Sequence, residues 1–269
     1  MDIPLKFTAM AERIKISAYR YFDSVNSTNL EGLSWLRQGG PDGAIVFADH
    51  QSAGRGRFER QWVTNPGSAI AVSILIHPTE SEQLYPALFS PLAGLALATI
   101  LRENYDIAAE IKWPNDVLIN HQKTAGILSE ASWDGTSLSG LIVGCGINIL
   151  AESIPAAGEI KFPATCIQAH VKKRIDRYEL LEAYLETFFR LRKTLTSANF
   201  INQWEKILAF RGEKVYIKGN DNSIKFSGRI IGIAPDGDLK LLTAGNQIET
   251  ISAGDVHLRP AANDETGRP

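Results

Sequence analysis

The hydrophobic pattern of the chain changes after about Phe210, and this change limits the folds that the chain can adopt. Beyond that residue, short apolar runs alternate with turn sequences such as Gly219-Asn220-Asp221 and Pro235-Asp236-Gly237. Closely spaced short strands with such turns are typical of a small β-barrel. We expect strands at 214–217, 224–233, 239–242 and 248–252. The sequence therefore predicts a small β domain over residues 210–260 and a loose tail over residues 261–269.

Upstream of Phe210, segments whose apolar residues are spaced as in strands are followed by segments whose apolar residues are spaced as in helices. The runs 44–48 and 69–76 are continuously apolar, as in buried strands. Residues 84–102 have helical spacing, and Pro91 favours a late start or a kink in that helix. Shorter strands are expected at 110–113, 117–120, 126–131 and 138–143, and further helices at 178–192 and 199–210. Residues 1–209 should form one mixed α and β domain, whose first element follows about 20 residues of chain.

Composition excludes several classes of protein. The net charge is -2 at pH 7, so no global positive field would draw the chain to DNA or to an anionic membrane. Cys145 and Cys166 form no CxxC pair, and the histidines lack metal-ligand spacing, so we expect no bound structural metal. The N-terminus lacks the apolar core of a signal peptide, and the apolar runs are too short to span a bilayer. We therefore expect a cytoplasmic protein.

A glycine- and arginine-rich segment is the first candidate for chemistry. Gly54-Arg55-Gly56-Arg57 is followed by Arg60 and Trp62. Glycines let the backbone approach a ligand closely, and arginines suit carboxylate and phosphate oxygens. Trp62 could form a wall beside an apolar ligand. A solvated basic turn followed by a core tryptophan would account for these residues equally well, and neither a P-loop nor a dinucleotide fingerprint is present.

Three further segments contain small, turn-forming or charged residues. Lys112-Trp113-Pro114-Asn115-Asp116 is extended and then turns, which could hold Asp116 toward a site or could be an ordinary turn. Lys123 precedes a small-residue run and could bring its charge into a cleft or lie in solvent at a hairpin end. Gly144-Cys145-Gly146-Ile147-Asn148 closes a hydrophobic strand, where the glycines allow close approach of a ligand or simply end the strand.

Together and in this order, the four segments resemble the biotin–protein ligase family. Ser27-Thr28-Asn29 resembles the first biotin-contacting turn of that family, and Asp255-Val256-His257-Leu258-Arg259 resembles the end of its C-terminal barrel. The resemblance implies an α+β fold, with a mixed β-sheet flanked by helices like that of class II synthetases and then a small SH3-like β-barrel. The stretch before the first expected element is too short for a helix-turn-helix module. The expected type is therefore the ligase-only member without an N-terminal DNA-binding domain.

The resemblance also implies roles for individual residues. The expected catalytic residues are Lys123, Arg57 and Asp116. The expected biotin-binding residues are Ser27, Thr28, Asn29, Gln51, Arg55, Gly56, Arg57 and Lys123. The expected nucleotide-binding residues are Arg55, Arg60, Trp62, Asn115, Lys123 and Asn148. We expect the segment that starts at Gly54 and ends at Trp62 to fold over the bound ligands as a lid.

The implied reaction is a two-step ligation by a biotin–[biotin carboxyl-carrier protein] ligase. ATP, with Mg²⁺, activates biotin as biotinyl-5'-AMP, and the biotin is then transferred to one lysine of a carboxylase carrier domain. A carboxylate and an α-phosphate repel each other, so cations must lie where their charges meet. Two alternatives remain open: a lipoate or octanoate protein ligase of related fold, and a non-catalytic biotin-sensing regulator. A monomer and a homodimer are both compatible with the sequence.

Overall fold

The computed structural model describes residues 3–16, 18–62, 64–155, 162–252 and 256–261. Its larger part is a seven-stranded sheet in the order β1–β2–β5–β9–β8–β7–β6. Strands β1 and β2 pair in parallel, and all other neighbours in this sheet are antiparallel. The strands are β1 (Tyr19–Val25), β2 (Ile45–Gln51), β5 (Ala69–Ile76), β6 (Glu110–Lys112), β7 (Asp116–Ile119), β8 (Gln122–Asp134) and β9 (Ser137–Asn148). The expected mixed sheet is confirmed.

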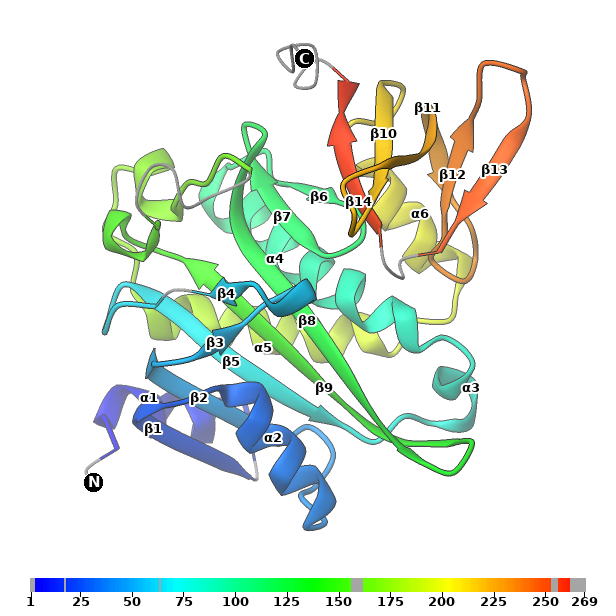
Figure 1. Ribbon diagram of the computed structural model, residues 1–269. Helices are drawn as coiled ribbons and strands as arrows, with labels where there is room; N and C mark the ends of the chain where they lie inside the picture. Colours follow the sequence, from blue (N-terminus) through cyan, green and yellow to red (C-terminus); the bar gives the residue numbers. More distant parts are fainter. Residues whose placement is uncertain (1–2, 17, 63, 156–161, 253–255, 262–269) are drawn as a thin grey trace.

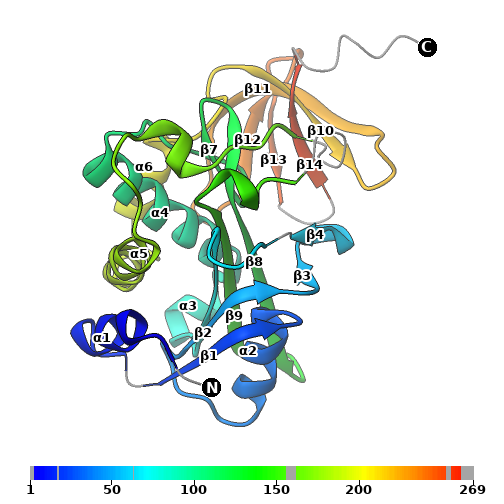
Figure 2. The same ribbon diagram turned by 90° about the vertical axis from the view of Figure 1, so that its left-hand side faces the viewer.

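Helices cover both faces of the large sheet. Helices α1, α4 and α5 lie on one face, and α2 lies on the other (Figures 1 and 2). Side chains on the strands alternate accordingly, so that Ile45 and Phe47 join the large core while Val46 packs with Leu36 of α2. The helices are α1 (Leu5–Arg13), α2 (Thr28–Arg37), α3 (Glu80–Gln83), α4 (Phe89–Tyr105), α5 (Arg177–Arg192) and α6 (Ala198–Lys206). Single 3-10 turns occur at η1 (Arg57–Glu59), η2 (Pro86–Leu88), η3 (Ala151–Ser153) and η4 (Ile167–His170).

The starts of two expected helices have clear local causes. Pro91 lies in the first turn of α4, where no intrahelical partner is needed for its missing N–H, so the expected late start is confirmed. Asp176 caps α5 because its side chain accepts hydrogen bonds from the backbone N–H groups of Tyr178 and Glu179. The helix expected at 199–210 is shorter, since α6 ends at Lys206.

Two helices were not expected from the sequence. Helix α1 lies within the stretch where no element was expected, and it buries Phe7, Met10 and Ala11 at helical spacing against α5 and the sheet. Ser27 is the N-cap of α2, so the segment expected as a turn at residues 27–29 is the entry to a helix that the sequence did not predict. The buried positions in the first turn of α2 are polar, so the apolar residues of this segment do not show a clear helical spacing.

The C-terminal strands form a second, five-stranded antiparallel sheet beside the first (Figure 1). Its strands are β10 (Lys214–Gly219), β11 (Ile224–Ile233), β12 (Leu239–Leu242), β13 (Ile248–Ile251) and β14 (Val256–Pro260). The order is β13–β12–β11–β10–β14, and the pairings among the described residues leave this sheet open instead of closing it into a barrel. Asp255 and the tail residues 262–269 lie outside the described residues.

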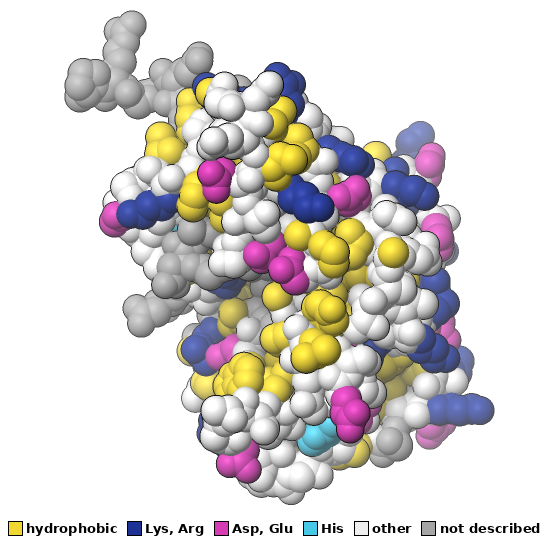
Figure 3. Space-filling view, turned by 90° about the vertical axis from the view of Figure 1, so that its right-hand side faces the viewer, with side chains coloured by type: hydrophobic (Ala, Val, Ile, Leu, Met, Phe, Trp, Pro, Cys, Tyr) yellow, Lys and Arg dark blue, Asp and Glu magenta, His cyan; other side chains and the backbone are white. Residues whose placement is uncertain are grey.

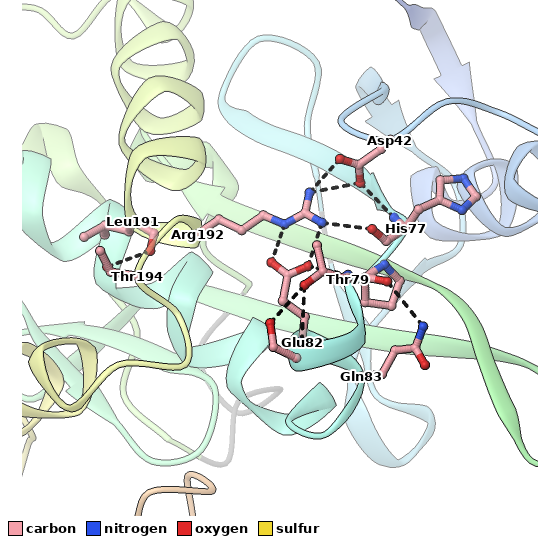
Figure 4. Close-up of polar contacts among 10 residues, drawn as sticks. Asp42, His77, Thr79, Glu82, Gln83, Leu191, Arg192 and Thr194 are labelled. Atoms are coloured by element: carbon pink, nitrogen blue, oxygen red, sulfur yellow. Dashed lines mark hydrogen bonds and ion pairs between the residues drawn. The ribbon is translucent and has the colours of Figure 1, made fainter.

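A largely buried arginine ties the C-terminal end of α5 to the loop before β2 and to α3 (Figure 4). Arg192 donates to both oxygens of Asp42, to both carboxylate oxygens of Glu82 and to the carbonyl of His77. Glu82 also closes a capping box with Thr79 at the start of α3. Burial raises the pKa of Glu82, but the hydrogen bonds from Arg192 and Thr79 together with the charge of Arg192 outweigh it and lower that pKa overall. This cluster is structural and lies outside the cleft described below.

No helix in the described part of the chain combines the length and the apolar character needed to cross a membrane.

Candidate active site

A cleft of about 990 Å³ opens on the sheet face that carries α2. Helix α2 lies at one end, and the short hairpin of β3 (Gly54–Arg55) and β4 (Gln61–Trp62) lies over its side. Residues of β14 in the C-terminal sheet line the other end. All the site residues expected from the sequence line this one cleft: Ser27, Thr28, Asn29, Gln51, Arg55, Gly56, Arg57, Arg60, Trp62, Asn115, Asp116, Lys123 and Asn148.

The end of the cleft at α2 is a connected set of polar groups. The backbone N–H and the hydroxyl of Thr28 both lie within hydrogen-bond distance of Oε1 of Gln51, at 2.8 and 3.1 Å. Oγ of Ser73 lies 2.8 Å from Oγ1 of Thr28 and 2.6 Å from Oδ1 of Asn29. Because Ser73 is fully buried on β5, it fixes these two side chains from below. This end of the cleft can therefore present fixed donors and acceptors to a polar ring.

A second set of contacts joins α2 to the arginine-rich hairpin. Nδ2 of Asn29 donates to Oε2 of Glu130 at 2.8 Å and to the carbonyl of Leu128 at 3.0 Å. The other carboxylate oxygen of Glu130 pairs with Nη1 of Arg55 at 3.0 Å. Glu130 thus links the first turn of α2 to the hairpin across β8.

Glycines form the floor of the cleft because larger residues would not fit there. Strand β9 turns Ile147 toward the core, and it turns Gly144 and Gly146 toward the cleft. A Cβ on Gly146 would overlap the indole of Trp62, and a Cβ on Gly144 would overlap the amide of Asn29. The bare backbone lets Trp62 lie flat against the sheet and form one wall of the cleft.

Three charged side chains form the middle of the cleft. Nζ of Lys123 lies 2.6 Å from Oδ1 of Asp116, and Nζ of Lys112 lies 3.3 Å from Oδ2 of the same carboxylate. Burial raises the pKa of Asp116, but the two lysines outweigh it and hold that pKa well below its usual range. Burial also lowers the pKa of Lys112 to about 8, against the attraction of Asp116. Nζ of Lys123 lies 5.6 Å from the centre of the Trp62 ring.

Two asparagines and the tryptophan complete the side of the cleft away from α2. Nδ2 of Asn115 donates to the carbonyl of Ile127 at 2.6 Å, and Nδ2 of Asn148 donates to the carbonyl of Thr165 at 3.1 Å. Oδ1 of Asn148 and Nε1 of Trp62 are buried and have no hydrogen-bond partner among the described residues. Such groups usually carry a cost unless a ligand or water satisfies them, so the cleft offers one acceptor and one donor.

Comparison with known proteins identifies the family. The model of the Biotin/lipoate A/B protein ligase family matches residues 21–148, and that of the Biotin protein ligase C terminal domain matches residues 212–259. The biotin–[acetyl-CoA-carboxylase] ligase of Paracoccus denitrificans is 34% identical over 232 residues, which cover 83% of this chain and 94% of that protein. This chain belongs to the biotin protein ligase family.

Two further members are similar over most of the chain. The bifunctional ligase/repressor BirA of Bacillus subtilis is 30% identical over 241 residues, which cover 88% of this chain and 73% of that protein. The structure of the biotin protein ligase from Aquifex aeolicus in complex with biotin and ATP has a TM-score of 0.77 at 30% identity. That comparison covers 91% of this chain and 100% of the Aquifex chain. The α+β fold expected for a biotin protein ligase is confirmed.

Sequence reasoning missed several residues that build the site of this ligase family member. Ser73, Glu130 and His257 were not expected, although His257 lines the cleft and the other two hold its lining residues. Ser73 left a weak signal, since it is a polar residue inside an otherwise apolar strand. His257 was expected only as part of the end of the C-terminal barrel, and Glu130 left no signal, because the contacts of both residues depend on residues distant in the sequence.

A second, shallower cavity of about 530 Å³ lies next to the cleft of this ligase. Phe58, Asn115 and Leu128 line both cavities, so the two lie side by side. The second cavity is also lined by Pro86 and by Trp133, a residue that is 56% exposed. Apolar side chains gather across the middle of the face shown in Figure 3, below the C-terminal sheet.

Proposed function

We propose that this protein activates biotin with ATP and transfers it to one lysine of a biotin carboxyl carrier domain. One observation carries the proposal: a single cleft brings Lys123, Arg55 and Arg57 together between a fixed polar end and an aromatic wall. The acyl donor and the nucleotide are both anionic, so a site that joins them needs such a concentration of positive side chains.

The ureido ring of biotin would occupy the polar end beside α2. Thr28 and Gln51 can exchange hydrogen bonds with its N–H and carbonyl groups, and Ser27 and Asn29 complete this end. The apolar valeryl chain would then run over the glycine floor of β9 along the indole of Trp62. This orientation brings the biotin carboxylate to Lys123.

The nucleotide would lie on the side lined by Asn115 and Asn148, with its α-phosphate next to the biotin carboxylate. In the first step, a carboxylate oxygen attacks the α-phosphorus, and the bond to the β-phosphate breaks to release pyrophosphate. Lys123, Arg55 and Arg57 would stabilise the charge that accumulates on the phosphate oxygens. Arg60 would reach the outer phosphates. Mg²⁺ would arrive bound to the phosphates of ATP and would offset part of their charge.

In the second step, the carrier lysine attacks the acyl carbon, and AMP leaves as the carbonyl re-forms. The amine attacks in its neutral form, and the proton that it loses on forming the amide passes to water. Asp116 is a weak base here, because Lys112 and Lys123 each occupy one of its oxygens. We infer that Asp116 orients Lys123 and does not accept the proton. The neighbouring second cavity, with its exposed Trp133, would give the carrier polypeptide a surface on which to dock beside the cleft.

The direct test mixes the protein with biotin, MgATP and a carrier domain and measures mass. We expect one biotinyl group on one lysine, and pyrophosphate release that depends on biotin. Pyrophosphate release that depends on lipoate or octanoate instead would replace this proposal with the lipoyl alternative. No release with any of the three acids would reject a ligase activity.

Replacing Lys123 tests the site assignment. Lys123→Ala should lower biotin-dependent pyrophosphate release by about a thousandfold, because the reacting oxygens lose the cation between them. The matched control is Lys172→Ala, which removes an exposed lysine outside the cleft. Near-normal release by the Lys123 variant would show that this lysine does not act on the reacting groups.

A further inference from the structure

The arginine-rich hairpin is fixed to the C-terminal sheet by a cluster of rings and guanidinium groups. The ring of Phe58 meets that of His257 on β14 edge to face, with centroids 4.4 Å apart and planes at 71°. Nη2 of Arg60 lies 3.3 and 3.5 Å from the two ring nitrogens of His257. The guanidinium of Arg57 lies 4.7 Å from the centre of the Phe58 ring. We call Phe58, Arg60 and His257 the clasp.

The backbone of the hairpin also depends on support from outside. Phe58 has φ 58° and ψ 45°, a left-handed conformation that a residue with a bulky side chain rarely adopts. Strands β3 and β4 contribute only two residues each, so their own pairing provides little stability. A hairpin this short keeps an unfavourable conformation only when contacts elsewhere hold it. Such contacts are made to His257 on one flank and by Arg55 to Glu130 on the other, while Trp62 packs on the glycine floor of β9 beside Lys123.

The imidazole of His257 is uncharged near pH 7, which favours its contact with Phe58 and the guanidinium of Arg60. Burial and the neighbouring cations Arg60, Arg259, Arg57 and Lys112 lower the pKa of His257 to about 4. The imidazole is therefore neutral near pH 7, and a neutral ring can pack beneath a guanidinium without charge repulsion.

We propose that His257 is a positioning residue that fixes the hairpin to the C-terminal sheet and so keeps Arg55 and Arg57 over the cleft. The inference rests on the proposed function for its consequence, which is retention of the adenylate. The contact itself is tested without any activity. In this arrangement the C-terminal sheet affects the reaction indirectly, because it holds the hairpin that covers the cleft.

The first experiment measures the loop alone. Trypsin can cleave after Arg55, Arg57 or Arg60 only when the hairpin detaches from the body of the protein. His257→Ala should accelerate native-state cleavage in this loop by about tenfold, because ring contact and guanidinium contact are both lost. His257→Phe keeps an uncharged ring against Phe58 and Arg60, so it should restore protection to within about twofold of wild type.

A matched control removes a similar ring contact elsewhere. His121 stacks on Phe210 with ring centroids 5.1 Å apart and does not line the cleft. His121→Ala should leave loop cleavage at the wild-type rate. Equal cleavage rates in wild type and His257→Ala, with all variants folded by circular dichroism, would overturn the inference. So would an equal acceleration by His121→Ala.

The second experiment measures the consequence for the reaction. Protein loaded with biotin and MgATP is separated from free ligand, and release of biotinyl-adenylate is followed over time. His257→Ala should release the adenylate about tenfold faster than wild type, with pyrophosphate still formed, and His257→Phe should not. Wild-type retention by His257→Ala would overturn the positioning role. If wild type forms no adenylate, the proposed function fails while the proteolysis result still stands.

Discussion

The two oxygens of Asp116 are each occupied by a different lysine. Lys123 lines the cleft and is 27% exposed at its side chain, whereas Lys112 is 5% exposed beneath it. A carboxylate between two cations is held fully charged and aims both ammonium groups. Asp116 therefore determines where the ammonium groups of Lys112 and Lys123 lie in the cleft.

Removing the negative charge should therefore damage both stability and the first chemical step. Asp116→Asn is isosteric but leaves Lys112 buried without a counter-charge. We expect the free energy of unfolding to fall by about 3 kcal/mol, because a broken buried pair exposes its remaining charge to an apolar site. Chemical denaturation and biotin-dependent pyrophosphate release measure the two effects. Asp134→Asn at the exposed end of β8 is the control. If both variants were equally stable, Asp116 would not be balancing buried charge.

The lowered pKa of Lys112 gives a pH dependence of known sign. Its folded pKa is about 8 and its ordinary value is 10.5. Below pH 8 both states hold the proton, so Lys112 adds no pH dependence there. Between pH 8 and 10.5 the unfolded chain binds more protons, so this lysine makes the free energy of unfolding rise with pH.

Comparison with a variant isolates this contribution. The free energy of unfolding of wild type minus that of Lys112→Met should increase from pH 8 to about pH 10. The same difference taken with Lys172→Met, an exposed lysine, should stay flat. A wild-type minus Lys112→Met difference that is flat or falls over this range would mean that the folded protein does not lower the pKa of Lys112.

At the scale of elements, strand β9 determines the shape of the cleft. It turns apolar side chains to the core and bare glycines to the ligand side, so Trp62 can pack on the backbone. Gly146→Ala should push the indole into the cleft and weaken biotin binding by at least about tenfold, since overpacking of a filled site has this magnitude. Titration calorimetry with biotin measures it. Gly245→Ala is a suitable control, because a Cβ there would meet no atom within 4 Å. Unchanged biotin affinity in the Gly146 variant would place biotin elsewhere.

Sequence alone predicted elements well where the local pattern and the tertiary environment agree. The strand at 224–233 was predicted with its observed bounds, because apolar residues and turn sequences delimit it. Helix α1 was missed although Phe7, Met10 and Ala11 have helical spacing, because the segment is short and has no side-chain cap. Helix α2 was missed because Thr28 and Asn29 are buried through hydrogen bonds, and these are invisible in an apolar pattern.

The candidate site was predictable to the extent that it is built from local segments. Each segment was ambiguous alone, and the structure brings all of the expected residues to one cleft. The supporting residues were not predictable, since Glu130 meets Asn29 from 101 positions away and Arg60 meets His257 from 197 positions away. The first contact exists only once α2 has packed on the large sheet, and the second only once the two sheets have come together.

At the scale of the whole molecule, buried contacts join the two sheets into one unit. Nε1 of Trp113 donates to the carbonyl of Gly237 at 3.1 Å, and Trp113 itself is fully buried. Gly237 also lies against Leu88, which precedes α4, and near Trp204 of α6. Because the contacts between the two sheets are so apolar, we expect the sheets to unfold together, although the sequence predicts a domain boundary near residue 210.

Two tryptophan variants test this cooperativity. Trp113→Phe removes an indole N–H and leaves the Gly237 carbonyl buried without its donor, whereas Nε1 of Trp204 has no hydrogen-bond partner among the described residues. Trp113→Phe should therefore lower the free energy of unfolding by about 1–3 kcal/mol more than Trp204→Phe. Because the sheets share this contact, hydrogen exchange should speed up equally in β8 and β11. Two separate unfolding transitions, or faster exchange in β11 alone, would show that the C-terminal sheet is an independent unit. In that case the clasp at His257 would have to hold the hairpin to a sheet that moves on its own.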